Sequence, residues 1–239
     1  MPVRELREFL RYRSSLVKLQ TSVKNRVHAI LTLHGVSDCP VTDLFGRAGR
    51  KWLSELQLPD IARQSIDGLL TILDVLHQRI LEANRLVERR AKRSADARRL
   101  QGIPGIGWFG ALLILAEVGD VRRFPDEHHF VSYAGLVPSV HSSGGHTRYG
   151  RITKQGSPWL RWIFVEAAAV ASRRPGQLRD RYLKLAYRKG TKTARVALAR
   201  HVAALAYLLL TRATLYDERY QQGSRSAHRP GCPAEPVVA

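Results

Sequence analysis

Apolar side chains recur at three- and four-residue steps along much of the chain, which is the spacing of a helix with one buried face. Residues 2–35 follow this pattern, and Gly35 is placed to end the helix. Residues 60–100 carry a second, denser apolar stripe that becomes strongly basic near its end. The two stretches predict a long helical hairpin or coiled coil, formed within one chain or with a second protomer. Residues 36–60 are rich in proline and glycine and are expected to hold short helices at most.

The pattern changes at residue 100, where the chain reads LQGIPGIGWFGALLILAEVGD. This stretch predicts a helix-hairpin-helix: a helix that ends at Gly102, a tight turn, and a small-residue helix from Trp108 to Val118. Gly105 and Gly107 would expose backbone N–H groups at a helix N-terminus, where a phosphate can bind. The alternative is that these glycines only allow two helices to pack closely.

The remaining helices are predicted from their capping residues. Ser157 as N-cap and Pro158 at the first helical position start one helix. Thr191 or Thr193 can cap a last helix, from Ala194 to about residue 211, whereas residues 120–129 are expected to form a polar connection.

The predicted fold class is therefore mainly α: a long helical hairpin or coiled coil followed by an α-helical domain that contains the helix-hairpin-helix. We expect a helical linker region over residues 1–99, a C-terminal domain over residues 100–220, and a disordered tail over residues 221–239, which has no core-forming pattern.

The excess of basic residues indicates which class of molecule the protein binds. The 239 residues include 39 Lys and Arg against 20 Asp and Glu, a formal net charge of +19. Such an excess favours a nucleic acid, because phosphate neutralisation supplies most non-specific affinity for it. An inert basic surface and a basic membrane-surface binder are the alternatives.

Two cysteines far apart, Cys39 and Cys232, have no metal-binding spacing and suit a reducing compartment. The N-terminal region lacks the apolar run of a signal peptide, and the apolar stretch 202–210 is shorter than a membrane span. These features predict a cytoplasmic protein without a membrane partner.

The candidate chemistry lies in residues 130–161. Ser143 precedes the flexible pair Gly144 and Gly145, which would let the backbone approach a ligand. Cationic side chains follow, and these could neutralise a phosphate: His146, Arg148, Arg151 and Lys154. Ser143 is then a candidate nucleophile, although a hydroxyl needs a base or charge stabilisation to react. The alternative is an ordinary glycine turn in a basic protein.

Several motifs occur in a fixed order: IPGIG, AEVGD, SYAGLVPS, SSGG, GRITKQG and, later, RKGTKTARVALAR. In this order they resemble the transposases of the insertion sequence one-ten group, relatives of the Piv-type DNA invertases, and the resemblance covers residues 2–220. It implies a recombinase in two parts: an N-terminal RuvC-like domain whose DEDD quartet binds magnesium, and a C-terminal domain that supplies a serine nucleophile. Ser143 matches that nucleophile, and Ser142 is a rival beside it.

The resemblance also implies DNA as partner, several protomers in the active assembly, and a structured bridge RNA that specifies donor and target in well-studied members. With the pattern above, it makes eight positions the predicted DNA or phosphate contacts: Gly105, Gly107, Gly144, Gly145, Arg148, Arg151, Lys154 and Arg161. No metal ligand is predicted within this chain.

The chain departs from the family pattern at its start. The RuvC-like domain normally precedes what is Met1 here, and Glu5 and Glu8, three residues apart among arginines, resemble ion-pair partners. We therefore expect a truncated protein, whether a gene remnant, an internal start or a fragment. It would bind DNA or RNA, alone or with a full-length relative, and would cleave little by itself. Magnesium is expected only with the missing domain, so enzymatic activity is left open.

Two other classes of function compete with a recombinase component. One is a non-catalytic helix-hairpin-helix module that binds nucleic acid and regulates a full-length transposase through mixed oligomers. The other is a basic structural protein with no reaction, in which Ser143 would be replaceable.

Overall fold

The computed structural model of the protein describes residues 3–36, 38–143 and 146–217, and these residues are mainly α-helical, as predicted. The chain divides into two compact units, Met1–Arg90 and Ala91–Ala239. The division falls inside a helix, a few residues before the boundary expected from the sequence. The tail predicted to be disordered, residues 221–239, lies outside the described residues.

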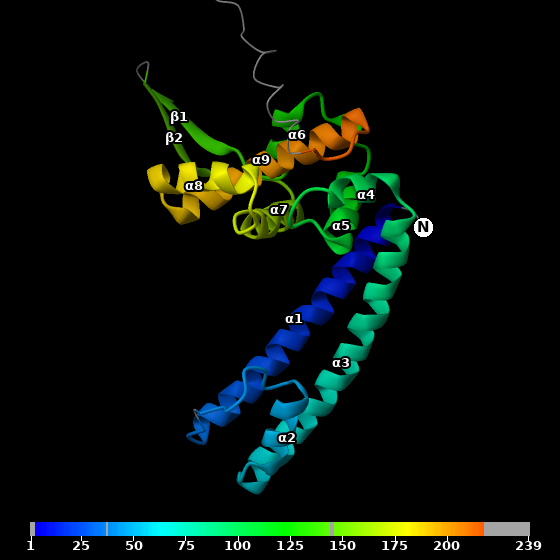
Figure 1. The fold of residues 1–239 in the computed structure, drawn as a ribbon, viewed down its shortest axis with the longest axis vertical. Helices are drawn as coiled ribbons and strands as arrows, with labels where there is room; N and C mark the ends of the chain where they lie inside the picture. The colour runs from blue at the N-terminus through cyan, green and yellow to red at the C-terminus, as the bar shows by residue number, and fades with distance from the viewer. Residues whose placement is uncertain (1–2, 37, 144–145, 218–239) are drawn as a thin grey trace, which may run out of the picture. The chain divides into compact units, whose positions relative to one another are not determined.

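The first unit is built on two long helices, α1 (Val3–Leu33) and α3 (Asp60–Lys92), which run antiparallel beside each other (Figure 1). Arg13 Nε of α1 donates a hydrogen bond of 2.9 Å to Asn84 Oδ1 of α3. The short helix α2 (Arg47–Glu55) packs beside the end of α1 and the start of α3. The core there consists of buried side chains from all three helices and the segment before α2: Val27, Leu31, Leu44, Leu53 and Ile66. The two amphipathic stretches thus pair within one chain.

The second amphipathic stretch is not one continuous helix to residue 100, so that prediction was wrong at its end. Helix α3 stops at Lys92, and a separate helix α4 (Ala95–Gln101) follows. Ser94 is the N-cap of α4, and its side chain accepts a hydrogen bond of 3.2 Å from the Ala97 N–H. A serine competes with helical backbone bonds inside a helix but stabilises a helix start, which accounts for the break.

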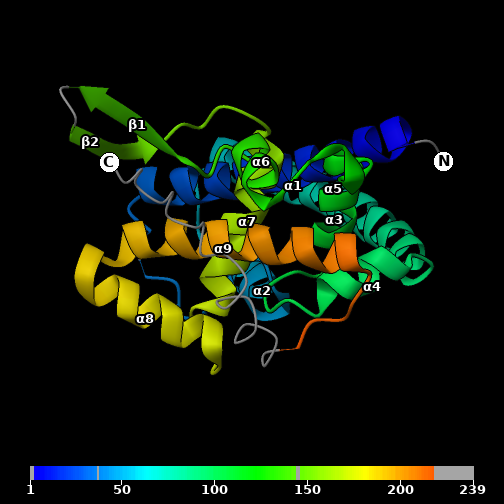
Figure 2. The same ribbon diagram turned by 90° about the horizontal axis from the view of Figure 1, so that it is seen from above.

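The second unit packs its helices around the long helix α9 (Thr191–Arg212) (Figure 2). Besides α4, the surrounding helices are α5 (Trp108–Val118), α6 (Glu127–Tyr133), α7 (Pro158–Ala171) and α8 (Gln177–Lys189). Helices α7 and α9 pack against each other and both carry buried alanines: Ala167, Ala168 and Ala171 on α7, and Ala199, Ala203 and Ala206 on α9. Small side chains allow neighbouring helix backbones to approach closely.

Helix α9 starts differently from the prediction. Its N-cap is Gly190, with φ of +78°, and no side chain caps it; Thr191 and Thr193 already lie inside the helix. Gly190 is also the C-cap of α8. A positive φ suits glycine, and it lets a single residue turn the chain from one helix into the next.

By length and composition alone, α9 is long and apolar enough to cross a membrane. Its most apolar window has a mean hydropathy of 1.3, and 56% of that window is buried inside the protein. The buried side chains of α9 pack against α4, α6, α7 and α8, which is also what the core helix of a globular unit does.

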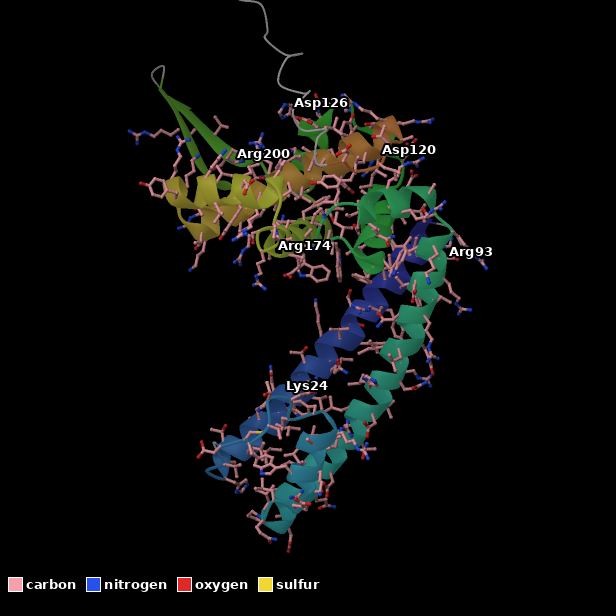
Figure 3. All side chains as sticks on the ribbon, in the orientation of Figure 1. Lys24, Arg93, Asp120, Asp126, Arg174 and Arg200 are labelled. Carbon is pink, nitrogen blue, oxygen red and sulfur yellow. The ribbon has the colours of Figure 1, made fainter. Side chains whose placement is uncertain are left out.

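The polar connection expected after α5, over residues 120–129, begins with a short 3-10 turn, η1 (Val121–Arg123). Helix α6 then starts at Glu127, and the sequence analysis did not predict it. Asp126 begins α6 by accepting a hydrogen bond of 2.9 Å from the His129 backbone N–H (Figure 3 labels Asp126). That bond is the main cause of the lowered pKa of Asp126.

Helix α6 brings Phe130 into the centre of an aromatic cluster. Phe130 is fully buried, and its ring lies 5.3 Å from Phe124, 6.1 Å from Phe164 and 5.6 Å from Tyr207, measured between ring centroids. The Tyr207 hydroxyl donates a hydrogen bond of 3.1 Å to the Phe124 carbonyl. This cluster joins α6, α7 and α9 around one centre.

Tyr207→Phe removes the hydrogen bond from the Tyr207 hydroxyl to the Phe124 carbonyl. We expect it to lower the free energy of unfolding by about 1 kcal/mol, because the buried Phe124 carbonyl loses its donor. Burial, and then the charges of Asp126 and Glu127, raise the pKa of Tyr207. The stability that neutral Tyr207 contributes is therefore fully present below the ordinary tyrosine pKa of about 10. It is lost as the pH rises from there through the raised pKa of the folded protein. Urea unfolding of Tyr207→Phe beside exposed Tyr187→Phe measures this, and equal stability of the two variants would contradict it.

Among the residues that the structure describes, two strands accompany the helices. Strands β1 (Pro138–Ser143) and β2 (His146–Ile152) form an antiparallel two-stranded sheet, with Ser143 opposite His146 and His141 opposite Arg148. The sequence analysis predicted no strands here: it expected a flexible glycine pair at a phosphate site or, as the alternative, an ordinary glycine turn. Two short runs of strand-forming residues around Gly-Gly are a recognised hairpin signal, so the strands were predictable from the sequence.

Candidate functional site

The two candidate nucleophiles, Ser142 and Ser143, are the last two residues of β1. They pair in register with Thr147 and His146 of β2, at the end of the hairpin farther from the helices (Figure 1). Gly144 and Gly145, two of the predicted phosphate contacts, lie outside the described residues. The hairpin thus presents the serines on a paired backbone, projecting from the helical part of the second unit.

The predicted cations follow along β2 and beyond it. Arg148 and Arg151 are exposed on the strand, and Lys154 is exposed just after it, with a φ of +56°. The register shifts between Pro138 and Val140, so β2 contains one more residue than β1 in this stretch. Such a bulge bends and twists a strand. Arg151 lies within this irregular stretch, whereas Arg148 lies in the regularly paired part.

Gly150 lies within this bulged part of β2, facing Ser139 of β1. A Cβ added to Gly150 would lie 2.4 Å from the Ser139 Oγ on the opposite strand. Because the missing side chain leaves room for Ser139, Gly150 allows the two strands to stay paired next to the bulge.

The base of the hairpin is tied to the end of α6. The Ser157 N–H donates 2.8 Å to the Tyr133 carbonyl, and the Thr153 N–H donates 2.9 Å to the Val137 carbonyl. Gly156 has a φ of +118°, and a Cβ there would lie 2.1 Å from the Tyr133 oxygen. The connection between β2 and α7 is therefore closely packed on the backbone before β1.

Arg161 holds the same connection from α7. Its Nη1 donates a hydrogen bond of 2.9 Å to the Lys154 carbonyl. The guanidinium also lies against Gly135, where an added Cβ would come within 2.6 Å of Arg161 Nη1. These contacts give Arg161 a positioning role in the loop that carries Lys154, while its contact with a phosphate stays a prediction.

Glu117 was missed in the sequence analysis, although it belongs to the base of the hairpin. It is only 4% exposed, and its Oε2 accepts a hydrogen bond of 3.1 Å from the Ser157 hydroxyl. Ser157 is also the N-cap of α7, as predicted, and accepts 3.4 Å from the Leu160 N–H. The bond joins the end of α5 to the start of α7. A glutamate in the apolar run ILAEV was the available signal, because a buried carboxylate requires partners.

The two glycines of the IPGIG turn have different surroundings. Gly105 has a φ of +92°, and a Cβ there would lie 2.5 Å from the Ala167 carbonyl oxygen of α7. Gly107 is exposed, is the N-cap of α5, and has nothing within 4 Å of an added Cβ. Gly105 therefore serves close packing of the turn on α7, whereas Gly107 leaves the start of α5 accessible.

The predicted residues thus fall into three groups within the second unit. The hairpin carries Ser142, Ser143, Arg148 and Arg151, the connection after it carries Lys154 with Arg161 reaching that connection from α7, and the IPGIG turn carries Gly105 and Gly107. In the described parts of the chain, no three or more His, Cys, Asp or Glu side chains gather as a metal site would need.

Comparison with known proteins identifies the class to which this arrangement belongs. Residues 97–183, which contain all three groups, match the model of the transposase IS116/IS110/IS902 family. A probable family 20 transposase of Pseudomonas aeruginosa is 31% identical over 217 residues, covering 86% of this chain and 63% of the relative. The transposase for insertion sequence element IS1111A of Coxiella burnetii is 30% identical over 227 residues, covering 89% of this chain and 60% of the relative.

A further relative is the insertion element IS110 uncharacterized 43.6 kDa protein of Streptomyces coelicolor, 33% identical over 126 residues, or 52% of this chain and 31% of the relative. Residues 97–183 thus carry the transposase domain of the IS116/IS110/IS902 family, and the chain is similar to transposases over most of its length, as the ordered motifs predicted. It spans about three fifths of the length of the Pseudomonas and Coxiella proteins.

Proposed function

We propose that this chain supplies the serine-bearing part of an insertion-sequence transposase, and that Ser143 is the nucleophile in DNA strand exchange. The observation that carries the proposal is the family match over residues 97–183, which includes the hairpin, its basic strand and the IPGIG turn. The formal charge of +19 supports a polyanionic substrate.

In this mechanism the Ser143 Oγ attacks a DNA phosphorus atom. An Oγ–P bond forms, one bridging P–O bond breaks, and the leaving oxygen takes up a proton as the serine hydroxyl loses its own. One strand is then held as a phosphoserine ester. The exposed cations Arg148, Arg151 and Lys154 offset negative charge on the pentacovalent transition state, and the contacts of Arg161 keep the Lys154 loop in position.

The resemblance to the family assigns the magnesium chemistry to a RuvC-like domain, which a full-length transposase can contribute in a shared assembly. DNA, a structured guide RNA and further protomers are the partners in this proposal, and the cytoplasm is the compartment. The steps assigned to this chain are to bind DNA and to form the phosphoserine bond.

The second candidate function is a nucleic-acid-binding module that regulates a full-length transposase without chemistry of its own. The accessible start of α5 behind Gly107 favours it, because helix N-termini bind phosphates. This function needs the basic surface and the IPGIG turn but not Ser143.

The test of the proposed function is a denaturing-gel assay for a covalent protein–DNA adduct. End-labelled DNA with a candidate element junction is incubated with this chain, with and without a separately expressed RuvC-like domain from a relative and magnesium. We expect an adduct only when the domain is added. Magnesium-dependent nicking by this chain alone would refute the division of labour. Salt-sensitive binding without any adduct would favour the regulatory module.

A further inference from the structure

The outward face of α8 combines exposed apolar side chains with exposed cations. Leu178, Leu185 and Ala186 lie at helical spacing on the buried or half-buried side, toward α9. On the opposite side Tyr187 is 94% exposed and Leu183 is 49% exposed. The helix therefore keeps an aromatic ring and an aliphatic side chain in solvent after its apolar side has been buried.

Cations surround this exposed pair. Lys184 and Arg188 are exposed and four residues apart, as are Leu183 and Tyr187, so the two pairs form adjacent rows on one helix face. Over residues 173–195 the sequence has nine Lys and Arg and one acidic residue, Asp180. Nitrogen-bearing side chains project outward along α8, with Arg174 before it and Arg200 on α9 (Figure 3). This face is thus strongly cationic and has an apolar centre.

The turn at Gly190 extends the same surface. Its single-residue connection brings the exposed Lys192 and Arg195 of α9 next to the end of α8. In both ribbon views, α8 and the β-hairpin lie at the same end of α9 (Figures 1 and 2). A strand bound along α8 would therefore lie at the end of α9 from which the hairpin projects.

We infer that the outward face of α8 binds an unpaired stretch of nucleic acid, with Tyr187 stacking on a base and Lys184 and Arg188 contacting phosphates. Charge complementarity selects a polyanion, and the exposed ring selects a strand whose base faces are free. Bases in a duplex are stacked on each other and do not offer a face to a side chain on a helix surface. The inference rests on the proposed function, since strand exchange opens DNA strands next to the protein.

The test measures binding of the full chain to fluorescent oligonucleotides of about 20 residues by anisotropy: oligo(dT), oligo(rU) and a DNA duplex. Tyr187→Ala should weaken binding of the single strands about tenfold, since stacking on one base contributes about 1–3 kcal/mol, and should change duplex binding less than twofold. Tyr187→Phe keeps the ring and should stay within about twofold of the parent chain. Tyr12→Ala, another exposed tyrosine flanked by arginines, is the matched control and should have no such selective effect.

The phosphate contacts have a separate readout. Lys184→Ala with Arg188→Ala should weaken binding to all three probes and lower the dependence of log affinity on log salt by about 1.4 for single strands. Stronger binding of oligo(rU) or of oligo(dT) would identify RNA or DNA as the occupant. Unchanged single-strand affinity in Tyr187→Ala, or an equal loss for the duplex, would overturn the inference. If Tyr187 instead binds a protein or a second copy of this chain, Tyr187→Ala should leave the single-strand affinity unchanged.

Failure of this inference can be told apart from failure of the proposed function. Ser143→Ala should leave binding to oligo(dT) unchanged, because the serine does not belong to the α8 face. Tyr187-dependent binding without any covalent adduct would retain the α8 site and remove the nucleophile. An adduct without Tyr187-dependent binding would retain the nucleophile and remove the α8 site.

Discussion

Replacing Ser143 by alanine is expected to abolish the covalent protein–DNA adduct, with a loss of at least about a thousandfold, because a methyl group cannot form the ester that holds the strand. The measurement is the adduct assay with the RuvC-like domain supplied. Binding of the same DNA should stay within about twofold of the parent chain, since a single hydroxyl contributes little to an interaction dominated by cations.

Ser142→Ala is the decisive comparison, because the two serines are neighbours on β1 and both belong to the paired part of the hairpin. We expect Ser142→Ala to keep most of the activity. Loss in Ser142→Ala with retention in Ser143→Ala would transfer the nucleophile to Ser142. Activity in both variants, and in the double variant, would eliminate a serine nucleophile from the hairpin.

Ser139→Ala provides a matched control on the same strand. Ser139 lies across from Gly150, near the bulge and away from the hairpin end. Its replacement removes a hydroxyl from β1 without touching the candidate nucleophiles. A comparable loss of adduct in Ser139→Ala would show that the assay reports the integrity of the hairpin and not the chemistry of Ser143.

Gly105→Ala is expected to lower the free energy of unfolding of the second unit by about 3 kcal/mol or more. The added Cβ would lie 2.5 Å from the Ala167 carbonyl and 2.8 Å from the Ala167 Cα, both backbone atoms of α7. A rotating side chain cannot relieve that overlap, so α5 and α7 must separate. The φ of +92° adds backbone strain for any residue with a Cβ. Urea unfolding followed by far-UV circular dichroism measures the loss.

Gly107→Ala is the matched control for this prediction, two residues away in the same turn. It has no atom within 4 Å of the added Cβ and no positive φ, so we expect a cost below about 1 kcal/mol at this N-cap position. Equal destabilisation by the two substitutions would contradict the assignment of Gly105 to helix packing. Weaker DNA binding by Gly107→Ala at unchanged stability would support a phosphate contact at the start of α5.

The positions of several helices were evident in the sequence, because their signals are local. The 3.6-residue periodicity identified α1 and most of α3, and Ser157 with Pro158 located the start of α7, which the structure confirms. Family membership was also readable, since it depends on motifs in linear order and not on their contacts. The same motifs identify Ser143 as the candidate nucleophile.

Other features depend on contacts between residues far apart in the chain, and only the tertiary structure decided them. The buried Glu117 meets Ser157 forty residues later, and Arg161 reaches back to the Lys154 loop and Gly135. The sequence showed two equivalent glycines in IPGIG, but α7 packs against only Gly105. Periodicity and capping depend on residues that are neighbours along one helix. The burial of a side chain, the close approach of two backbones and the partner of the buried Glu117 depend instead on which elements pack together.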